Sequence, residues 1–440
     1  MITSCIVCKK SFNPEENEGK FFGTKNNKYY ICKNDWYPFS TGKIIGRLEF
    51  IGQILDHLQN EDDGEQSKQN FMQLISGKEN KAYPENPIIM NPREIVNELN
   101  RYVVGQEEAK KRLGIAVYEH QCISFNKMLK LQDKKSNILF LGPSGTGKTL
   151  LSHTIAKSLD VPFVSVDATN FSPVGFHGAD VDTMVGDLLA KSGGNIAATE
   201  RGVIFIDEID KISYNSASNN SDTLMKGVQS SLLRLLEGKE VKVPTGPMNK
   251  SHIIVRTDNI LFICGGVFPN LSEILEKKMG REKKMGFSHV ENKEQTSRNF
   301  KICKNAPEDI MTESLMDYGL ISELVGRLSV IVPLSPLNES ELKNILSNLS
   351  NSPFAQQKEI FKYSGYDLEF DNDTTEKIIQ MALKMSTGAR ALDALTKRVV
   401  SSAAFNLLGE SEKKETGKVI IKQECLENPD LFIFEKSTTI

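Results

Sequence analysis

The pattern of apolar and polar positions predicts two folded domains in the central and C-terminal parts of the chain. Short apolar runs, such as Ile138–Leu141 and Val203–Ile206, alternate with segments whose apolar residues recur at helical spacing. This alternation is typical of a mostly parallel sheet with helices on both faces. After Pro336 the pattern is mainly helical and predicts a smaller second domain. We therefore expect an α/β large domain over residues 88–335, a small helical domain over 336–424 and a C-terminal tail over 425–440.

The first part of the chain has a different pattern. Residues 1–42 are rich in Asn, Lys and Gly with little helical periodicity, so we expect a small module that is held together by a metal. Apolar residues from Ile44 to Leu58 then recur near helical spacing, and this helix either closes the module or pairs with a second copy. Residues 59–87 are polar and charged, which indicates a linker. The N-terminal module is thus expected to span residues 1–58.

Composition narrows the class of protein. The 440 residues are 39% hydrophobic, enough for sizeable cores, and the net charge of -3 gives no bulk attraction to nucleic acid or to an anionic membrane. The chain does not start with a basic segment and an apolar run, and no segment has the roughly 18 apolar residues of a membrane span. We expect a cytoplasmic protein that binds neither nucleic acid nor a membrane. The seven cysteines are odd in number, and four of them are scattered, with Cys264 inside an apolar strand-like run, which disfavours a disulfide framework. The scattered cysteines are Cys122, Cys264, Cys303 and Cys425.

A complete phosphate-binding motif, G-x-x-x-x-G-K-[ST], lies between the apolar run Ile138–Leu141 and a helical pattern. In this context, backbone N–H groups and a helix N-terminus converge on phosphates. Lys148 is expected to contact the β and γ phosphates of ATP, and Thr149 is expected to ligate Mg²⁺. The motif and the residue after it are Gly142, Pro143, Ser144, Gly145, Thr146, Gly147, Lys148, Thr149 and Leu150.

A carboxylate pair ends the second buried strand. Asp207 and Glu208 follow Val203–Ile206, and ligands bind at this carboxyl edge of parallel sheets. Asp207 is expected to help hold the hydrated Mg²⁺, and Glu208 is expected to act as the base that polarises the attacking water. The pair therefore predicts hydrolysis of ATP as well as its binding. The alternative is a solvated acidic loop.

Four motifs, in this order, resemble the ClpX family of ring-forming AAA+ ATPases: Tyr102–Gln106, the phosphate motif, Asp207–Ile212 and Asn259–Gly266. The resemblance runs from about Asn91 to Asp393 and extends more loosely to the N-terminal module. It implies an ATP-dependent unfoldase that assembles with itself, as a homo-hexamer, and takes unfolded or tagged protein substrates into a central pore. It also implies a ClpP-type peptidase as a partner and leaves room for adaptor proteins.

The resemblance assigns roles around the nucleotide. Val103 and Val104 would supply apolar walls for the adenine, and Gln106 would read its edge. Arg327 matches the family's arginine finger, which offsets charge on the γ phosphate in the neighbouring subunit. Arg390 matches the sensor arginine of the small domain, which touches the nucleotide of its own subunit.

Gly175–Gly178 lies where the family has an aromatic pore loop, usually Gly-Tyr-Val-Gly. Phe176 keeps the aromatic ring and His177 replaces an apolar residue, so the grip on substrate and its response to pH are expected to differ. Two other pore segments depart further from the family. Ser221–Thr223 lacks the expected arginine, and Asn249–His252 only weakly resembles the basic entrance loop. Substrate choice is therefore the least transferable property.

Met285, Gly286 and Phe287 lie where the family presents an Ile-Gly-Phe tripeptide that inserts into pockets on the ClpP peptidase. Methionine keeps an apolar anchor at the first position, and the polar surroundings predict an exposed loop. The resemblance thus predicts docking to a peptidase. An ordinary charged loop is the alternative.

Cys5 and Cys8, followed by Cys32 and Asp35, have the paired spacing of zinc ligands, in the place where the family carries a four-cysteine zinc module. Zinc accepts carboxylate oxygen, so we predict a site of three cysteines and Asp35. His57 is another candidate for the fourth ligand. The alternative is a decayed site in which the cysteines only pack.

The sequence therefore predicts an ATPase that unfolds and translocates proteins, with ATP, Mg²⁺ and Zn²⁺ as cofactors. Three other hypotheses compete with it: a peptidase-independent remodeller of protein complexes, a nucleotide-switched DNA-binding ring ATPase, and a scaffold that does not hydrolyse ATP. The intact Lys148, Asp207, Glu208 and Arg327 disfavour the scaffold, and the nearly neutral net charge disfavours DNA binding.

Overall fold

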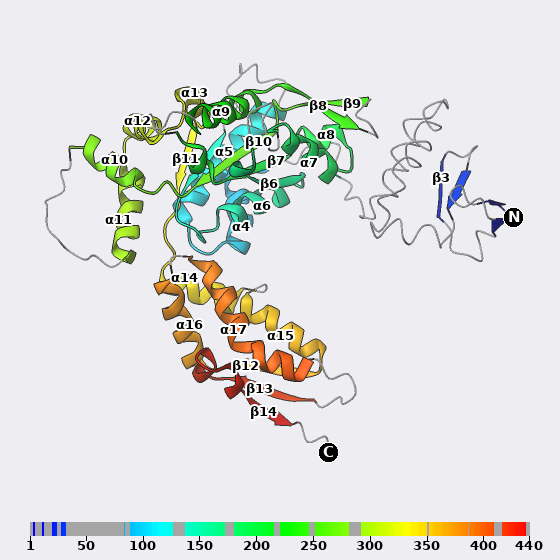
Figure 1. Cartoon of the computed structure of the whole chain (residues 1–440), viewed down its shortest axis with the longest axis vertical. Coiled ribbons are helices and arrows are strands. Elements are labelled where there is room, and N and C mark those ends of the chain that lie inside the picture. Colours follow the sequence, from blue (N-terminus) through cyan, green and yellow to red (C-terminus); the bar gives the residue numbers. More distant parts are fainter. Residues whose placement is uncertain are drawn as a thin grey trace.

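The structure is a computed structural model of the chain (Figure 1). Near the N-terminus it describes two antiparallel strand pairs, β1 (Thr3–Ser4) with β2 (Ser11–Phe12) and β3 (Lys20–Gly23) with β4 (Lys28–Ile31). The expected zinc ligands Cys5, Cys8, Cys32 and Asp35, the alternative ligand His57 and the helix from Ile44 to Leu58 lie outside the described residues. Beyond these strands the described residues are 83, 89–125, 137–171, 180–214, 221–245, 251–280, 292–349, 352–385, 387–408 and 416–436.

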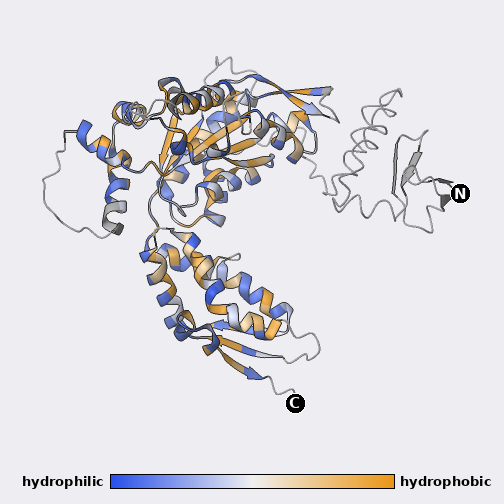
Figure 2. Ribbon diagram, viewed as in Figure 1, coloured by the Kyte–Doolittle hydropathy of each residue, from blue (hydrophilic) through white to orange (hydrophobic). Residues whose placement is uncertain are grey.

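The large domain is built on a five-stranded parallel sheet with the strand order β11-β5-β10-β7-β6. Alternate residues of each strand enter two different hydrophobic cores: Leu139 and Ile204 enter one, and Phe140 and Phe205 the other. Both faces are buried, which explains the continuous apolar runs that colour these strands orange in Figure 2. The strands are β5 (Ile138–Leu141), β6 (Phe163–Asp167), β7 (Val203–Asp207), β10 (Leu261–Gly266) and β11 (Val330–Pro333).

Helices cover both faces of this sheet, which confirms the α/β fold predicted from the sequence. Leu99, Leu113 and Leu151 are fully buried against one face. They belong to α4 (Pro92–Tyr102), α5 (Glu107–Phe125) and α6 (Lys148–Ser158). The other face is covered by α7 (Thr183–Lys191), α9 (Ser221–Glu237), α10 (Leu271–Lys278), α12 (Glu308–Tyr318) and α13 (Ser322–Arg327).

Local sequence signals fix where several of these elements begin. Asn91 caps α4: its Oδ1 accepts a hydrogen bond from the backbone N–H of Glu94 at 3.0 Å, while the Glu94 carboxylate accepts one from the N–H of Asn91 at 2.9 Å. Pro92 fits the first turn because its missing N–H is not needed there. The remaining elements of the large domain are η2 (Ala168–Asn170), α8 (Ile196–Thr199), η3 (Ile209–Ile212), α11 (Asn292–Asn305) and the hairpin of β8 (Glu240–Thr245) and β9 (Ser251–Arg256).

The small domain has its own hydrophobic core and lies below the large domain in Figure 1. Its helices pack against a three-stranded sheet with the order β12-β13-β14. The helices are α14 (Glu339–Lys343), η5 (Asn344–Asn348), α15 (Pro353–Tyr363), α16 (Asn372–Lys384), α17 (Ala389–Leu408), η6 (Gln423–Leu426) and η7 (Pro429–Leu431), and the strands are β12 (Tyr366–Phe370), β13 (Gly417–Ile421) and β14 (Ile433–Lys436).

The boundary expected at residue 424 is too early, because the segment expected as a tail is part of this domain. β14 pairs with β13 in antiparallel fashion, with Ile433 opposite Ile420. Cys425 and Leu426 are buried in the small-domain core, and Phe434 packs against it. The apolar residues of this segment thus complete a core that the preceding helices leave open.

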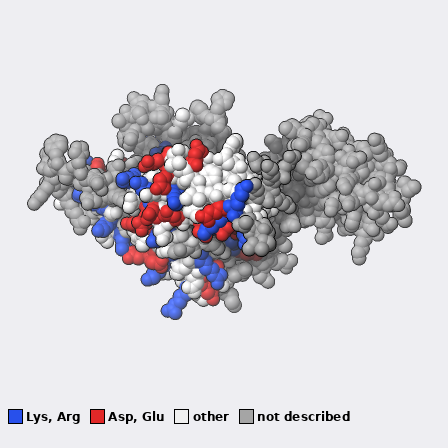
Figure 3. All heavy atoms as spheres, turned by 90° about the horizontal axis from the view of Figure 1, so that it is seen from below, with Lys and Arg blue, Asp and Glu red and all other residues white. Residues whose placement is uncertain are grey.

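The surface of the described residues agrees with the balanced composition. Figure 3 shows Lys and Arg interspersed with Asp and Glu on the face that it presents. Among the described helices, none is both long and apolar enough to cross a membrane. Cys122, Cys264, Cys303 and Cys425 are free thiols, and Cys264 is buried in β10 as its apolar surroundings predicted.

Candidate nucleotide site

The phosphate motif forms a loop between β5 and α6 at the carboxyl edge of the sheet. Gly145 and Gly147 adopt positive φ angles of 75° and 97°, which glycine reaches without strain. Gly147 precedes the first turn of α6, and no side chain caps that helix. The N-terminal amides of α6 therefore point toward the loop, where they suit an anionic ligand.

A cavity of about 360 Å³ lies over this loop. Large-domain and small-domain residues line it together, which makes it an interdomain site. Its lining consists of Ser144, Gly145, Gly147, Lys148, Thr149, Leu150, Asp207, Glu208, Asp210, Lys211, Gly266, Val267, Ala389 and Arg390.

Lys148 is folded back onto the loop. Its ammonium donates hydrogen bonds to the backbone oxygens of Gly142 at 2.8 Å and Pro143 at 3.0 Å. Burial lowers the pKa of Lys148, and the nearby carboxylates of Asp207 and Asp210 act in the opposite direction. A phosphate at this position would replace the carbonyl oxygens as a stronger, charged acceptor.

Asp207 and Glu208 lie at the end of β7, as the sequence predicted, and both line the cavity. Glu208 has a left-handed backbone with φ 57°, an uncommon conformation for a residue with a side chain. The Asp207 carboxylate accepts a hydrogen bond from the N–H of Glu208 at 2.9 Å, which supports this turn. The turn places two carboxylates on one side of the cavity.

Asp210 is a third acidic residue of the site to which sequence reasoning assigned no role. It is only 3% exposed; one carboxylate oxygen accepts from the N–H of Val267 at 3.2 Å, and the other has no hydrogen-bond partner among the described residues. A Cβ at Gly266 would lie 2.7 Å from Asp210, so only glycine leaves room for this carboxylate. The sequence signal that could have identified Asp210 is its position three residues after Asp207, in the short helix η3.

The side-chain amide of Gln106 is engaged in hydrogen bonds within the chain, and Gln106 does not line the cavity. Its side-chain NH₂ donates to the backbone oxygen of Ser335 at 2.7 Å, and its side-chain oxygen accepts from the N–H and the hydroxyl of Ser335 at 2.9 and 3.1 Å. The amide that was expected to read the adenine edge thus holds the connection between the two domains. Val103 is buried and Val104 half-buried, and neither lines the cavity. Their contact with adenine stays a prediction.

Arg390 is brought to the phosphate loop of its own chain. Its guanidinium donates to the hydroxyl of Ser144 at 3.2 Å, and the N–H of Ala389 donates to the backbone oxygen of Gly145 at 3.3 Å. α17 begins at Ala389, so the start of this helix lies directly on the loop. The small domain therefore contacts the phosphate loop through the start of α17.

Arg327 lies at the end of α13 and does not line the cavity of its own chain. Its guanidinium pairs with Glu237, with Nε 3.0 Å and Nη2 2.8 Å from the same carboxylate oxygen. Both side chains are about two-fifths exposed, at 44% and 40%. An arginine in this position is accessible to a neighbouring molecule.

The other predicted functional loops lie outside the described residues. These are the segment of Phe176 and His177, the segment of Met285, Gly286 and Phe287, and residues 249–250 of the entrance loop. Ser221–Thr223 begins α9, and Ser251 and His252 begin β9.

Comparisons with known proteins identify the family. Residues 133–331 match the AAA domain (Cdc48 subfamily), and this stretch contains the phosphate loop, the carboxylate pair and Arg327. The chain is 37% identical over 348 residues to the ATP-dependent Clp protease ATP-binding subunit ClpX of Treponema denticola, covering 77% of this chain and 82% of that protein. This chain belongs to the ClpX family of AAA+ proteins. Like other members of that family, it is an ATPase.

The geometry fits the nucleotide and Mg²⁺ that a ClpX-family ATPase uses. The α6 amides and Lys148 offer donors to phosphates, while Thr149 and Asp207 offer oxygen ligands of the kind that Mg²⁺ prefers. No group of three or more His, Cys, Asp or Glu side chains suited to a metal occurs among the described residues.

Proposed function

We propose that this ClpX-family ATPase unfolds protein substrates and threads them through the pore of a homo-hexameric ring into a ClpP-type peptidase. The observation that carries the proposal is the cavity between the domains, to which the small domain contributes Ala389 and Arg390. Hydrolysis at such a site changes the contacts that hold two domains together, so it can drive their relative motion. The name of the Treponema denticola relative, a subunit of a Clp protease, supports a peptidase partner.

Four side chains of the cavity have roles in the proposed reaction: Lys148, Thr149, Asp207 and Glu208. Lys148 and the α6 amides hold the phosphates, and Thr149 and Asp207 hold Mg²⁺, which neutralises phosphate charge. Glu208 takes a proton from the attacking water. The adenine would lie against Val103 and Val104.

Two arginines would bring a neighbouring subunit and the small domain into the reaction. Arg327 would reach the site of the neighbouring subunit and offset the charge that develops on the γ phosphate. Its exposure and its absence from its own cavity support this role. Arg390 would report loss of that phosphate to the small domain.

The remaining roles rest on sequence resemblance alone. Phe176 and His177 would contact the substrate in the pore, and Met285, Gly286 and Phe287 would dock to the peptidase. Cys5, Cys8, Cys32 and Asp35 would hold Zn²⁺ in the N-terminal module.

The test is ATP-dependent unfolding of a stable, tagged protein with and without a ClpP-type peptidase. We expect unfolding in both reactions and degradation only with the peptidase. Unfolding that never leads to degradation would favour a peptidase-independent remodeller. ATP hydrolysis with salt-sensitive retention of DNA and no unfolding would favour a DNA-binding ring ATPase and overturn the proposal.

A further inference from the structure

The turn that follows α9 makes an ion pair at each of its two ends. Glu237, before the turn, pairs with Arg327. Lys239, after it, pairs with Asp182, its ammonium lying 2.6 and 2.9 Å from the two carboxylate oxygens. Only Gly238 separates the two residues. One short turn thus connects the expected arginine finger to the start of α7.

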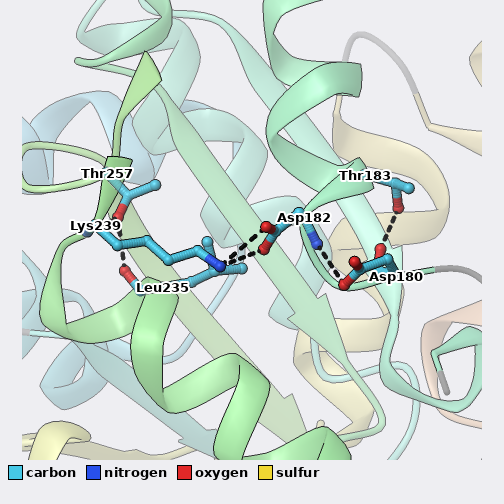
Figure 4. A network of polar contacts seen from close by, with 6 residues as sticks. All are labelled: Asp180, Asp182, Thr183, Leu235, Lys239 and Thr257. Carbon is cyan, nitrogen blue, oxygen red and sulfur yellow. Dashed lines mark hydrogen bonds and ion pairs between the residues drawn. The ribbon is translucent and has the colours of Figure 1, made fainter. Parts of the chain in front are cut away.

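The turn is held rigidly by the buried Thr257 (Figure 4). Its hydroxyl accepts a hydrogen bond from the N–H of Lys239 at 2.9 Å and donates to the backbone oxygen of Leu235 at 2.9 Å. Its own N–H donates to the backbone oxygen of Lys239 at 3.0 Å. Gly238 has a φ of 97°, and a Cβ there would lie 2.8 Å from the carboxylate of Asp258. A movement at one end of so constrained a turn is transmitted to the other end.

The Arg327 end is anchored to the strand that leads into the phosphate loop. Asn137 lies directly before β5 and is fully buried. Its side-chain NH₂ donates to the backbone oxygen of Arg327 at 3.0 Å and to that of Leu236 at 3.4 Å. The ends of α13 and α9 are therefore fixed to each other at the amino end of β5, the strand whose carboxyl end leads into the phosphate loop of the same chain.

The Asp182 end is unusual for a helix start. An aspartate before a helix normally accepts hydrogen bonds from the first backbone amides, but Asp182 makes no such bond to α7. Its carboxylate turns to Lys239 instead, while Asp180 and Thr183 make the local turn (Figure 4). Asp180 directly follows residues 172–179, which contain Phe176 and His177. The ion pair thus lies at the start of α7, shortly after the segment proposed to grip substrate in the sequence.

We propose that the turn Glu237–Lys239 couples Arg327 to the start of α7, and that Lys239 is a positioning residue for substrate movement. The inference rests on the proposed function, in which Arg327 acts on the nucleotide of a neighbouring subunit. When that nucleotide is hydrolysed, Arg327 loses a partner and Glu237 regains it. The turn delivers this change, through Lys239 and Asp182, to α7 in the same subunit.

Two variants that remove charge and preserve shape test the coupling: Lys239→Met and Asp182→Asn. We expect ATP turnover to change little, because neither residue lines the nucleotide cavity. The number of ATP molecules consumed per tagged protein unfolded should rise about three- to tenfold, which lies within the roughly two- to thirtyfold effect of residues that carry coupling between sites. An unchanged ratio in both variants would overturn the inference.

Lys278→Met is the matched control. The Lys278 side chain is 25% exposed, close to the 27% of Lys239, and it also makes two contacts with carboxylates, those of Glu313 and Asp317. Its ion pairs lie on α10 and α12, away from the turn. The control should keep the wild-type ratio; an equal rise in this variant would show that any lost ion pair has the effect, and would overturn the inference.

A double variant that exchanges the charges of residues 182 and 239 distinguishes loss of the ion pair from misfolding. The double variant Lys239→Glu with Asp182→Lys rebuilds the ion pair with reversed polarity, and we expect it to restore most of the wild-type ratio. Failure to restore it, with ATP turnover intact, would contradict the inference. If wild-type protein hydrolyses ATP and unfolds nothing, the proposed function itself fails, so the two failures are distinguishable.

Discussion

Glu208 combines a carboxylate that faces the cavity with a backbone conformation that favours glycine. Such conformations persist where the surrounding structure holds them, and they concentrate at functional sites. The neighbouring Asp207 accepts from the Glu208 amide and so supports the turn. The position of this carboxylate is therefore set by the backbone, and a substitution that preserves side-chain shape isolates its chemistry.

Glu208→Gln should leave ATP binding intact and lower steady-state turnover about 10²-fold or more, because the amide cannot accept a proton from water. Fluorescent-nucleotide binding and ATP hydrolysis, measured on the same preparation, check both parts. Near-normal hydrolysis in the variant would remove Glu208 from the role of base.

The buried cysteines give a prediction about pH. Burial raises the pKa of Cys264 to about 12 and that of Cys303 to about 11, against about 8.5 in an unfolded chain. Because the folded pKa values are the higher ones, these thiols contribute stability that is fully present below pH of about 8.5 and is lost as the pH rises toward 11 and 12.

The complete burial of Cys264 should protect its thiol from alkylation at about pH 9, where an exposed thiol is largely ionised. Iodoacetamide labelling of native protein, read residue by residue by mass spectrometry, should modify Cys264 only after denaturation. The half-buried Cys122 serves as the internal reference. Labelling of Cys264 as fast as Cys122 would contradict the burial.

At the scale of elements, the segment before α5 and the connection between the domains are held together by one side chain. Gln106 and Ser335 are 229 residues apart and share three hydrogen bonds, and Gln106 is 5% exposed. If the amide is removed, the N–H and the hydroxyl of Ser335 lose the Gln106 oxygen that accepts their hydrogen bonds. Both donors are then left without this partner at a mostly buried position. The domain connection should then loosen beside the phosphate loop.

Gln106→Ala should lower the free energy of unfolding by about 1 to 3 kcal/mol and should weaken the affinity for ATP. Calorimetry with and without nucleotide measures both effects. The exposed Gln380→Ala is the control, and it should change neither quantity. Equal behaviour of the two variants would mean that Gln106 does not fix the connection.

Local patterns predicted the elements well. The runs around Ile138–Leu141 and Val203–Ile206 form strands on either side of β10 in one parallel sheet, and the phosphate motif forms the expected loop, because short-range sequence dictates both. Helices on both faces followed from the same alternation. These features depend on neighbours within a few residues.

Contacts between distant residues were not predictable in the same way. Nothing in the motif Tyr102–Gln106 shows that its glutamine meets Ser335, and Asp210 reaches the cavity only because Gly266 leaves room for it. The end of the small domain was missed for the same reason. Its last strand is short, and only its partner β13 reveals it as part of a sheet.

At the scale of the whole molecule, substitution of Arg327 tests whether neighbouring subunits of the proposed ring share active sites. Arg327→Ala should lower ATP turnover about 10²-fold, below the 10³ to 10⁵ known for arginine fingers elsewhere. Mixed with Glu208→Gln subunits, the variant should recover part of the activity, because its own intact site then receives Arg327 from a neighbour. Full activity of the variant alone, or no recovery in mixed rings, would place Arg327 outside a shared site.

The proposed link to a peptidase gives the last prediction. Apolar tips that enter pockets dominate such contacts, and several weak loops around a ring add avidity. Phe287→Ala should leave ATP turnover and unfolding nearly unchanged and should reduce degradation with a ClpP-type peptidase at least about tenfold.

Phe405→Ala is a suitable control for that variant, since Phe405 is 86% exposed on the small domain. It should degrade substrate at the wild-type rate. Unchanged degradation by Phe287→Ala would refute the docking role, and equal loss of all three activities would mean that Phe287 is structural.

The strand β14 has a consequence for a protein proposed to handle extended polypeptides. It occupies the free edge of β13, whose other edge pairs with β12. An uncovered strand edge attracts any extended chain, since its N–H and C=O groups form a template for pairing. β14 covers this edge of β13 and becomes the outer strand itself, but it has only four residues and ends in the charged Glu435 and Lys436, and short, charged edge strands pair poorly with other chains. The last strand of the small domain thus limits pairing of this sheet with the extended polypeptides that the proposed motor would handle.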